Sequence, residues 1–129
     1  MSAIFLTTDL IFASRVQAAA RSAGVELRLV STAAAVLERA CSQATDLVIL
    51  DLTASDCDPQ HLVPRLRASE HVPQIIAYAP HVMESRLAAA RQAGCDQVLT
   101  RGQFDRQYDG ILRLFAGQRE IDGPAPATV

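Results

Sequence analysis

The chain has 129 residues, half of them hydrophobic, and a formal net charge of −2. This length allows one domain with a core of its own and is too short for two ordinary domains. The hydrophobic content is typical of a globular protein, and the weak negative charge predicts no general attraction to nucleic acid or to an anionic membrane. All 12 basic residues are arginine, which excludes mechanisms that need a Schiff-base lysine, a phosphate-loop lysine or a lysine general base.

The cysteine content and the N-terminus indicate a reducing compartment. Cys41, Cys57 and Cys95 are odd in number and form no Cys-x-x-Cys pair, so neither a disulfide framework nor a zinc ribbon is expected. Met1 leads directly into a strand-like run without the basic segment and long apolar core of a signal peptide. No apolar run approaches membrane-spanning length, and we expect a cytoplasmic protein with reduced thiols.

The first part of the chain alternates strand and helix patterns. The expected elements are a strand at 3–6, a helix at 10–23 ended by Gly24, an alternating edge strand at 25–30, a helix capped by Ser31 or Thr32 that runs to Ala40, and a buried central strand that ends at Asp51.

The alternation continues to the end of the predicted domain. The expected elements are a helix begun by Asp58 and Pro59, a strand at 74–78 with an exit loop at 79–81, a helix at 82–93 closed by Gly94, a strand at 96–100, a turn at Arg101 and Gly102, and a last helix at 104–115.

Five strand–helix pairs predict an α/β fold with one parallel five-stranded sheet and helices on both faces, in the flavodoxin-like order 2-1-3-4-5. The stretch from Gly117 onward holds two prolines, two glycines and few apolar residues. We therefore predict one domain over residues 1–117 and a flexible C-terminal tail over 118–129.

Asp51 ends the central apolar strand, and a polar loop follows it. In open α/β sheets, ligands and chemistry collect at the edge where the carboxyl ends of the strands meet, which we call the mouth of the sheet. Asp51 is therefore the first candidate site residue. The alternative is that Asp51 only ends the strand and is solvated.

Other side chains predicted near the mouth have weaker cases. A transition-metal site could be drawn from His61, His81, Asp9, Asp51, Asp56 and Asp58, but only scattered spacings support it, and two surface histidines are the simpler interpretation. Cys57 is a redox candidate or an inert small residue. Asp58 is best explained as a helix cap and Tyr78 as a packing residue. Thr7 and Thr8 lack the glycines of a phosphate-binding loop, so a dinucleotide enzyme is poorly supported.

The sequence resembles response-regulator receiver domains over about Ala3 to Phe115. The strongest parts are the run 47–52 and the segment 88–96, which is similar to the family's A-x-x-A-G-A-x-x-Y pattern before the fifth strand; the spacing from Gly94 to Arg101 also fits. The resemblance implies the receiver (βα)5 three-layer sandwich and a role in two-component signal transduction. In that family an aspartate accepts a phosphoryl group while magnesium is held by this aspartate and a pair of acids.

Carried over residue by residue, the resemblance implies Asp51 as the phosphoacceptor equivalent and Asp9, with Asp51, as the ligands of a weakened or absent magnesium site. The other family positions are altered: Thr8 replaces the second acid, Ala79 stands at the hydroxyl position counted back from Gly94 (or Tyr78, counted forward from Pro73), Val98 replaces the switch aromatic, Arg101 replaces the lysine and Gly102 the proline after it. Arg101 could pair with Asp51 or with Asp9 and hold the site in one state.

These losses should remove most of the contacts that report a phosphate, and a ligand shifts an equilibrium only through differential contacts. The sequence thus resembles the pseudo-receivers, and we predict a stand-alone module that acts by phosphorylation-independent binding of a signalling or regulatory protein. No cofactor other than weak magnesium, and no enzymatic activity beyond self-phosphorylation at Asp51, is expected. One alternative is a phosphorylatable regulator in a phosphorelay, with Asp51 as the phosphoacceptor. The other is a small α/β enzyme, which no sequence motif supports.

The expected partner surface is the fourth helix, the fifth strand and the last helix, a face that receivers commonly use and that could also form a homodimer. Its candidate charged contacts are Arg86, Arg91, Arg106 and Arg113, although a solvated helix face would look the same in sequence.

Overall fold

The computed structural model describes residues 1–122, with residues 118–122 described as helix backbone only. Its elements in chain order are β1 (Ser2–Leu6), α1 (Leu10–Ala23), β2 (Glu26–Val30), α2 (Ala33–Ser42), β3 (Leu47–Asp51), α3 (Pro59–Arg67), β4 (Gln74–Ala79), α4 (Glu84–Ala93), β5 (Gln97–Thr100) and α5 (Arg101–Asp122). Within the described residues, no helix is both long and apolar enough to cross a bilayer.

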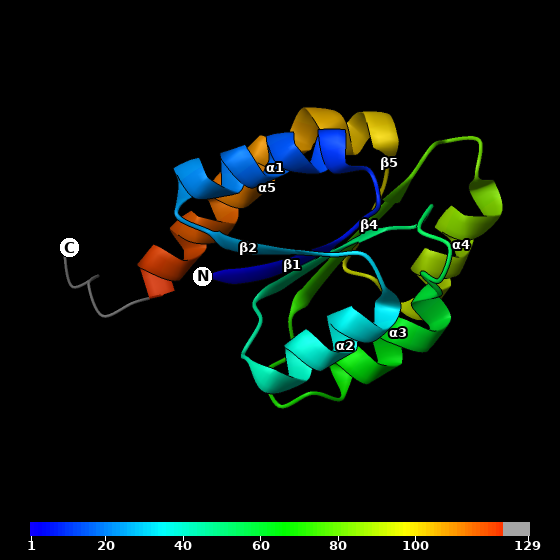
Figure 1. Cartoon of the computed structure of the whole chain (residues 1–129), viewed down its shortest axis with the longest axis horizontal. Coiled ribbons are helices and arrows are strands. Elements are labelled where there is room, and N and C mark those ends of the chain that lie inside the picture. The colour runs from blue at the N-terminus through cyan, green and yellow to red at the C-terminus, as the bar shows by residue number, and fades with distance from the viewer. Residues whose placement is uncertain (123–129) are drawn as a thin grey trace.

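The strands form one sheet in the order β2-β1-β3-β4-β5, and every neighbouring pair is parallel. The predicted flavodoxin-like topology, with β2 at an edge, is confirmed. Helices α1 and α5 cover one face, and α2, α3 and α4 cover the other (Figure 1).

Strand β3 lies at the centre of the sheet and is buried along its whole length. Leu47 and Ile49 pack in the cluster under α1 and α5, whereas Val48 and Leu50 pack in the cluster under α2, α3 and α4. This burial on both faces explains the uninterrupted apolar run in the sequence. Asp51, the last residue of β3, is thereby placed at the mouth of the sheet.

Side-chain caps begin three of the helices. Asp9 accepts a hydrogen bond at the start of α1, Thr32 does so at the start of α2, and Asp58 does so at the start of α3. Gly24 and Gly94 close α1 and α4 with φ angles of 78° and 93°, a region that favours glycine. Of the two predicted caps for α2, Thr32 is therefore the one used.

The last helix differs most from the prediction. Thr100 and Gln103 form a reciprocal cap, in which the Thr100 N–H donates to Gln103 Oε1 (2.9 Å) and the Gln103 N–H donates to Thr100 Oγ1 (3.1 Å). Helix α5 therefore begins at Arg101, where a turn was predicted, and it runs to Asp122.

The helix thus includes residues 118–122 of the predicted tail, and residues 123–129 of that tail lie outside the described residues. Smaller differences are that β4 includes Ala79, which was predicted in the exit loop, that α2 continues to Ser42, and that α4 begins at Glu84.

Candidate functional site

The carboxylate of Asp51 is buried, with 3% of the residue exposed, and hydrogen bonds reach both of its oxygens. Thr7 Oγ1 donates to Oδ2 at 2.6 Å. Thr53 donates twice to Oδ1, from its backbone N–H at 3.0 Å and from its hydroxyl at 2.6 Å. Two neutral side chains therefore satisfy this buried negative charge.

Thr7 is the site residue that the sequence analysis missed. It directly follows β1, is 2% exposed, and also accepts a hydrogen bond from the Asp9 N–H at 3.0 Å. The register pairs Leu6 with Leu50, so the next residue on each strand brings Thr7 beside Asp51. Thr8, which was expected at the altered acid position, is exposed. The register between β1 and β3 is what places Thr7 beside Asp51. Counting residues along the chain from Asp9 does not give this register.

Asp9 and Arg101 form the second contact at the mouth. Asp9 Oδ1 accepts a bond from the Phe12 N–H at 3.1 Å, and Arg101 Nη1 donates to Asp9 Oδ2 at 3.3 Å. The guanidinium carbon of Arg101 also lies 3.9 Å from the centre of the Phe12 ring, in a cation–π contact. Of the two predicted partners of Arg101, the structure places Asp9 against it. Both side chains are well exposed, so the ion pair is worth less than about 1 kcal/mol.

The two candidates for the hydroxyl position point to opposite faces of the sheet. Tyr78 lies opposite Asp51 in the strand register and packs in the α1/α5 cluster, whereas Ala79 packs in the other cluster. Tyr78 stacks on Phe104 with ring centres 4.5 Å apart, which agrees with its predicted packing role. Burial, and secondly the negative charge of Asp51, raise the pKa of the Tyr78 phenol, so the hydroxyl stays protonated. The Thr7 side chain lies close enough to this buried hydroxyl to lower its pKa slightly, but no described residue meets hydrogen-bond geometry with it.

Comparison with known proteins decides the family. The model of the response regulator receiver domain family matches residues 8–107. The chain belongs to this family. No curated protein matches the chain.

Solved structures share the fold at low sequence identity. The chain is similar to the receiver domain of the sensor histidine kinase PA1611 from Pseudomonas aeruginosa PAO1, a structure with magnesium in its active-site cleft, at 22% identity and a TM-score of 0.74 over 90% of this chain and 97% of that one. It is similar to a receiver domain protein from Methanospirillum hungatei at 14% identity and a TM-score of 0.76 over 95% and 98%. It also resembles a streptococcal redox sensor evolved from response regulators, at 12% identity and a TM-score of 0.76 over 93% and 52%.

The remaining altered positions of this receiver domain lie at β5 and α5. Val98 is half-buried and packs against the cluster under α2, α3 and α4, with Ala77 as its register partner on β4. Gly102 lies exposed in the first turn of α5. Val98 therefore provides no aromatic side chain here, and Gly102 contributes no side chain to the first turn of α5.

A receiver's magnesium site requires free carboxylate oxygens, because magnesium takes oxygen ligands in a strict octahedral arrangement. Both oxygens of Asp51 accept hydrogen bonds, and both oxygens of Asp9 contact the α1 backbone or Arg101. Thr7, which adjoins Asp51, contributes a hydroxyl where an acid would supply a charge. A magnesium ion would have to share these oxygens with the hydrogen bonds they already accept, and the site of Asp9 and Asp51, weakened or absent, stays a prediction.

The structure does not assemble the alternative metal site. Among the side chains that the structure describes, those of residues 1–117, no three of His, Cys, Asp or Glu come together in a way that could hold a metal ion. Asp56 Oδ2 instead accepts a bond from the Ala33 N–H at 3.0 Å, and Asp58 caps α3 as predicted. His81 is exposed, and His61 Nδ1 lies 3.1 Å from Arg65 Nη1.

Cys57 is buried in the core under α3 and α4. Burial, and then the negative charges of Asp51 and Asp56, raise the pKa of its thiol to about 12. The thiolate is the reactive form of cysteine, so a thiol that stays protonated favours the inert interpretation over a redox role.

The four candidate arginines of the partner surface differ in their contacts. Arg86 Nη1 donates to the Leu52 carbonyl at 2.6 Å, so this side chain reaches toward the loop after Asp51. Arg113 pairs with Asp109 one helical turn away, at 3.1 Å. Arg91 and Arg106 are exposed on α4 and α5.

Proposed function

We propose that this receiver domain acts by binding a signalling or regulatory protein in a state that phosphorylation of Asp51 does not control. The hydrogen bonding of Asp51 carries the proposal. Its two oxygens accept three bonds from Thr7 and Thr53, so the carboxylate is occupied in the resting protein. Thr53 uses both acceptor sites of Oδ1 and Thr7 uses one of the two at Oδ2, so these bonds stabilise the carboxylate and lower its nucleophilicity toward a phosphoryl donor.

The charge around Asp51 supports the same proposal. A transferred phosphoryl group carries negative charge that receivers offset with magnesium and a lysine, as the family resemblance implies. Here the corresponding cation, Arg101, pairs with Asp9 and packs on Phe12. The neighbour that adjoins Asp51 is the neutral Thr7. A phosphorylated Asp51 would therefore find little compensating charge in the present arrangement.

The groups that would transmit a phosphorylation signal are also replaced. Ala79 has no hydroxyl, and its methyl group is buried in the core, while Val98 replaces the switch aromatic. A phosphorylation signal needs contacts that differ between the phosphorylated and unphosphorylated states. These substitutions therefore favour a partner surface that does not change when Asp51 is phosphorylated.

The proposed partner surface combines α4, β5 and α5, with Arg91 and Arg106 as exposed charges. The partner would be a protein with acidic side chains opposite these arginines, and a second copy of the chain is the alternative occupant. We assign the domain no substrate turnover.

A phosphorylation assay tests the central claim. Purified protein is incubated with acetyl phosphate and magnesium chloride, and its intact mass is measured beside that of Asp51→Asn and of a receiver domain that has the full acidic set. We expect a phosphoryl adduct in that reference domain alone. An adduct on this protein that is absent from Asp51→Asn would refute the proposal and favour a phosphorelay role.

Partner binding gives a second test. Capture from a lysate of the native host should recover the same protein with wild type and with Asp51→Asn, and should lose it with Arg106→Glu. Arg21→Glu is the matched control, because Arg21 is an exposed arginine on α1, on a different surface. Loss of the partner in Asp51→Asn would contradict phosphate-independent binding.

A further inference from the structure

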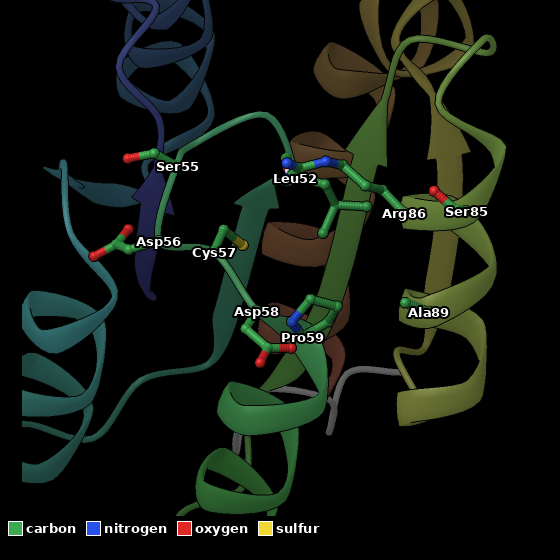
Figure 2. Close-up of a pocket in the computed structure, with 9 residues that line it drawn as sticks. All are labelled: Leu52, Ser55, Asp56, Cys57, Asp58, Pro59, Ser85, Arg86 and Ala89. Carbon is green, nitrogen blue, oxygen red and sulfur yellow. Dashed lines mark hydrogen bonds between the residues drawn. The ribbon is translucent and has the colours of Figure 1, made fainter.

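Arg86 connects helix α4 to the loop that follows Asp51. Figure 2 shows its side chain extending from α4 toward Leu52, beside a cavity of about 330 Å³ between the loop and the helix. Nη1 of Arg86 donates to the Leu52 carbonyl at 2.6 Å. The Leu52 N–H donates to the Tyr78 carbonyl at 2.9 Å, so one residue of the loop is held by β4 and by α4 at the same time.

Helix α4 packs on α3, β4 and β5, but its N-terminal end makes few polar attachments. Its N-cap residue, Met83, makes no side-chain capping bond, and only Leu87 and Ala90 are buried among its ten residues. The neighbouring helix α3 has nine residues, of which four are buried, and it begins with the Asp58 cap. In a first turn without a capping bond, the charge-assisted hydrogen bond of Arg86 should therefore help to fix the position of the helix.

The opposite side of the same loop is attached to Asp51. Thr53 bonds Asp51 Oδ1 through both its N–H and its hydroxyl, and Leu52 lies between Thr53 and the acid. A shift of Thr53 relative to Asp51 would move the Leu52 carbonyl, which is the acceptor for Arg86. This connection runs along the backbone and does not pass through Ala79, where the family's hydroxyl is missing.

We infer that Arg86 is a positioning residue that couples the hydrogen bonding of the Asp51 loop to the placement of α4. Its biological consequence rests on the proposed function, because α4 is part of the proposed partner surface. A partner that grips α4 would then be linked to the Asp51–Thr53 contacts without any phosphoryl group. The cavity beside the Arg86 side chain leaves room for the guanidinium to move when that linkage is used.

Hydrogen exchange followed by mass spectrometry tests the attachment. In Arg86→Met, the amides of α4 should exchange about ten-fold faster than in wild type, the factor expected for losing one charge-assisted bond. Arg91→Met is the matched control, since Arg91 is an exposed arginine on the same helix, and its α4 should exchange as in wild type. Arg86→Lys keeps the charge and should give an intermediate rate. Unchanged exchange in α1 peptides shows that each variant is folded.

Equal α4 exchange in Arg86→Met and Arg91→Met would overturn the attachment. The coupling is tested by adding Thr53→Val, which removes the hydroxyl bond to Asp51. Thr53→Val should speed α4 exchange when Arg86 is present and have no further effect in Arg86→Met. The same increase in both backgrounds would overturn the coupling. Neither measurement uses a phosphoryl donor, so an adduct in the separate phosphorylation assay would refute the proposed function without deciding whether Arg86 couples the loop to α4.

Discussion

Replacing Thr7 by valine removes the hydroxyl that satisfies Asp51 and keeps the shape of the side chain. The hydroxyl donates to Asp51 Oδ2 at 2.6 Å and accepts from the Asp9 N–H at 3.0 Å. Asp51 is 3% exposed, so water cannot easily replace the lost donor. A hydrogen bond to a charged group contributes about 1.5–3 kcal/mol and a neutral one about 0.5–1.5 kcal/mol. Because valine recovers part of this by apolar burial, we expect Thr7→Val to lower the free energy of unfolding by about 2–3 kcal/mol.

Urea denaturation followed by circular dichroism measures this change. With a slope of about 1.5 kcal/mol per molar urea, the transition midpoint should fall by about 1.5 M. Thr8→Val is the matched control: Thr8 is the exposed neighbour of Thr7, and its replacement should change stability by less than about 0.5 kcal/mol. If the two variants were equally stable, Asp51 would not depend on Thr7, and our description of the mouth as a satisfied hydrogen-bond network would be wrong.

Three further predictions concern Cys57, Thr7 and Tyr78. Burial raises the Cys57 pKa to about 12, so its protonated thiol contributes stability that is complete below about pH 9 and is lost as the pH rises toward 12. Between about pH 9 and 10.5, the free energy of unfolding measured in urea titrations should fall by about 1.5 kcal/mol more in wild type than in Cys57→Ala. Equal losses in the two proteins would contradict this. Thr7→Asp places a second carboxylate beside Asp51, so magnesium should raise the melting temperature of this variant and not that of Thr8→Asp. The opposite result would support Thr8 as the altered acid position, as the sequence analysis predicts. Tyr78→Phe removes a buried hydroxyl that no described residue pairs, so its stability should match or exceed that of wild type by up to about 1 kcal/mol, and a clear loss would reveal a partner for that group.

The order of the elements could be predicted from sequence because each has a strong local signal. The apolar run of β3 reflects burial on both faces, the alternation in β2 reflects an edge strand, and Gly24 and Gly94 mark positive φ angles at helix ends. The start of α5 was also readable, because Thr100-x-x-Gln103 has the spacing of a reciprocal cap. The sequence analysis did not use that signal and predicted a turn at Arg101 and Gly102 instead.

The contacts of the site could not be predicted in the same way. Which residue adjoins Asp51 depends on the register between β1 and β3, and this brings Thr7 to the acid while Thr8 stays exposed. The choice of Arg101 between two carboxylates depends on the reach of its side chain across the mouth and on the ring of Phe12 beside it. Such contacts join residues on different strands and helices, so spacing along the chain carries little information about them.

A hydroxyl rather than a carboxylate stands beside Asp51, and this changes what the mouth needs in order to be stable. Two carboxylates at that distance would repel each other, and a cation would be required to hold them together. A threonine in contact with Asp51 removes the repulsion and supplies a donor, so the buried charge is satisfied without a metal ion. The remaining acid, Asp9, is matched by Arg101 and by the first turn of α1. Each of the two acids thus finds its partners within the domain, and an external ion or phosphoryl group would have to compete with these contacts. A mouth built in this way favours a single conformation of the domain. The proposed phosphorylation-independent partner needs such a domain, because it would bind the same surface at all times.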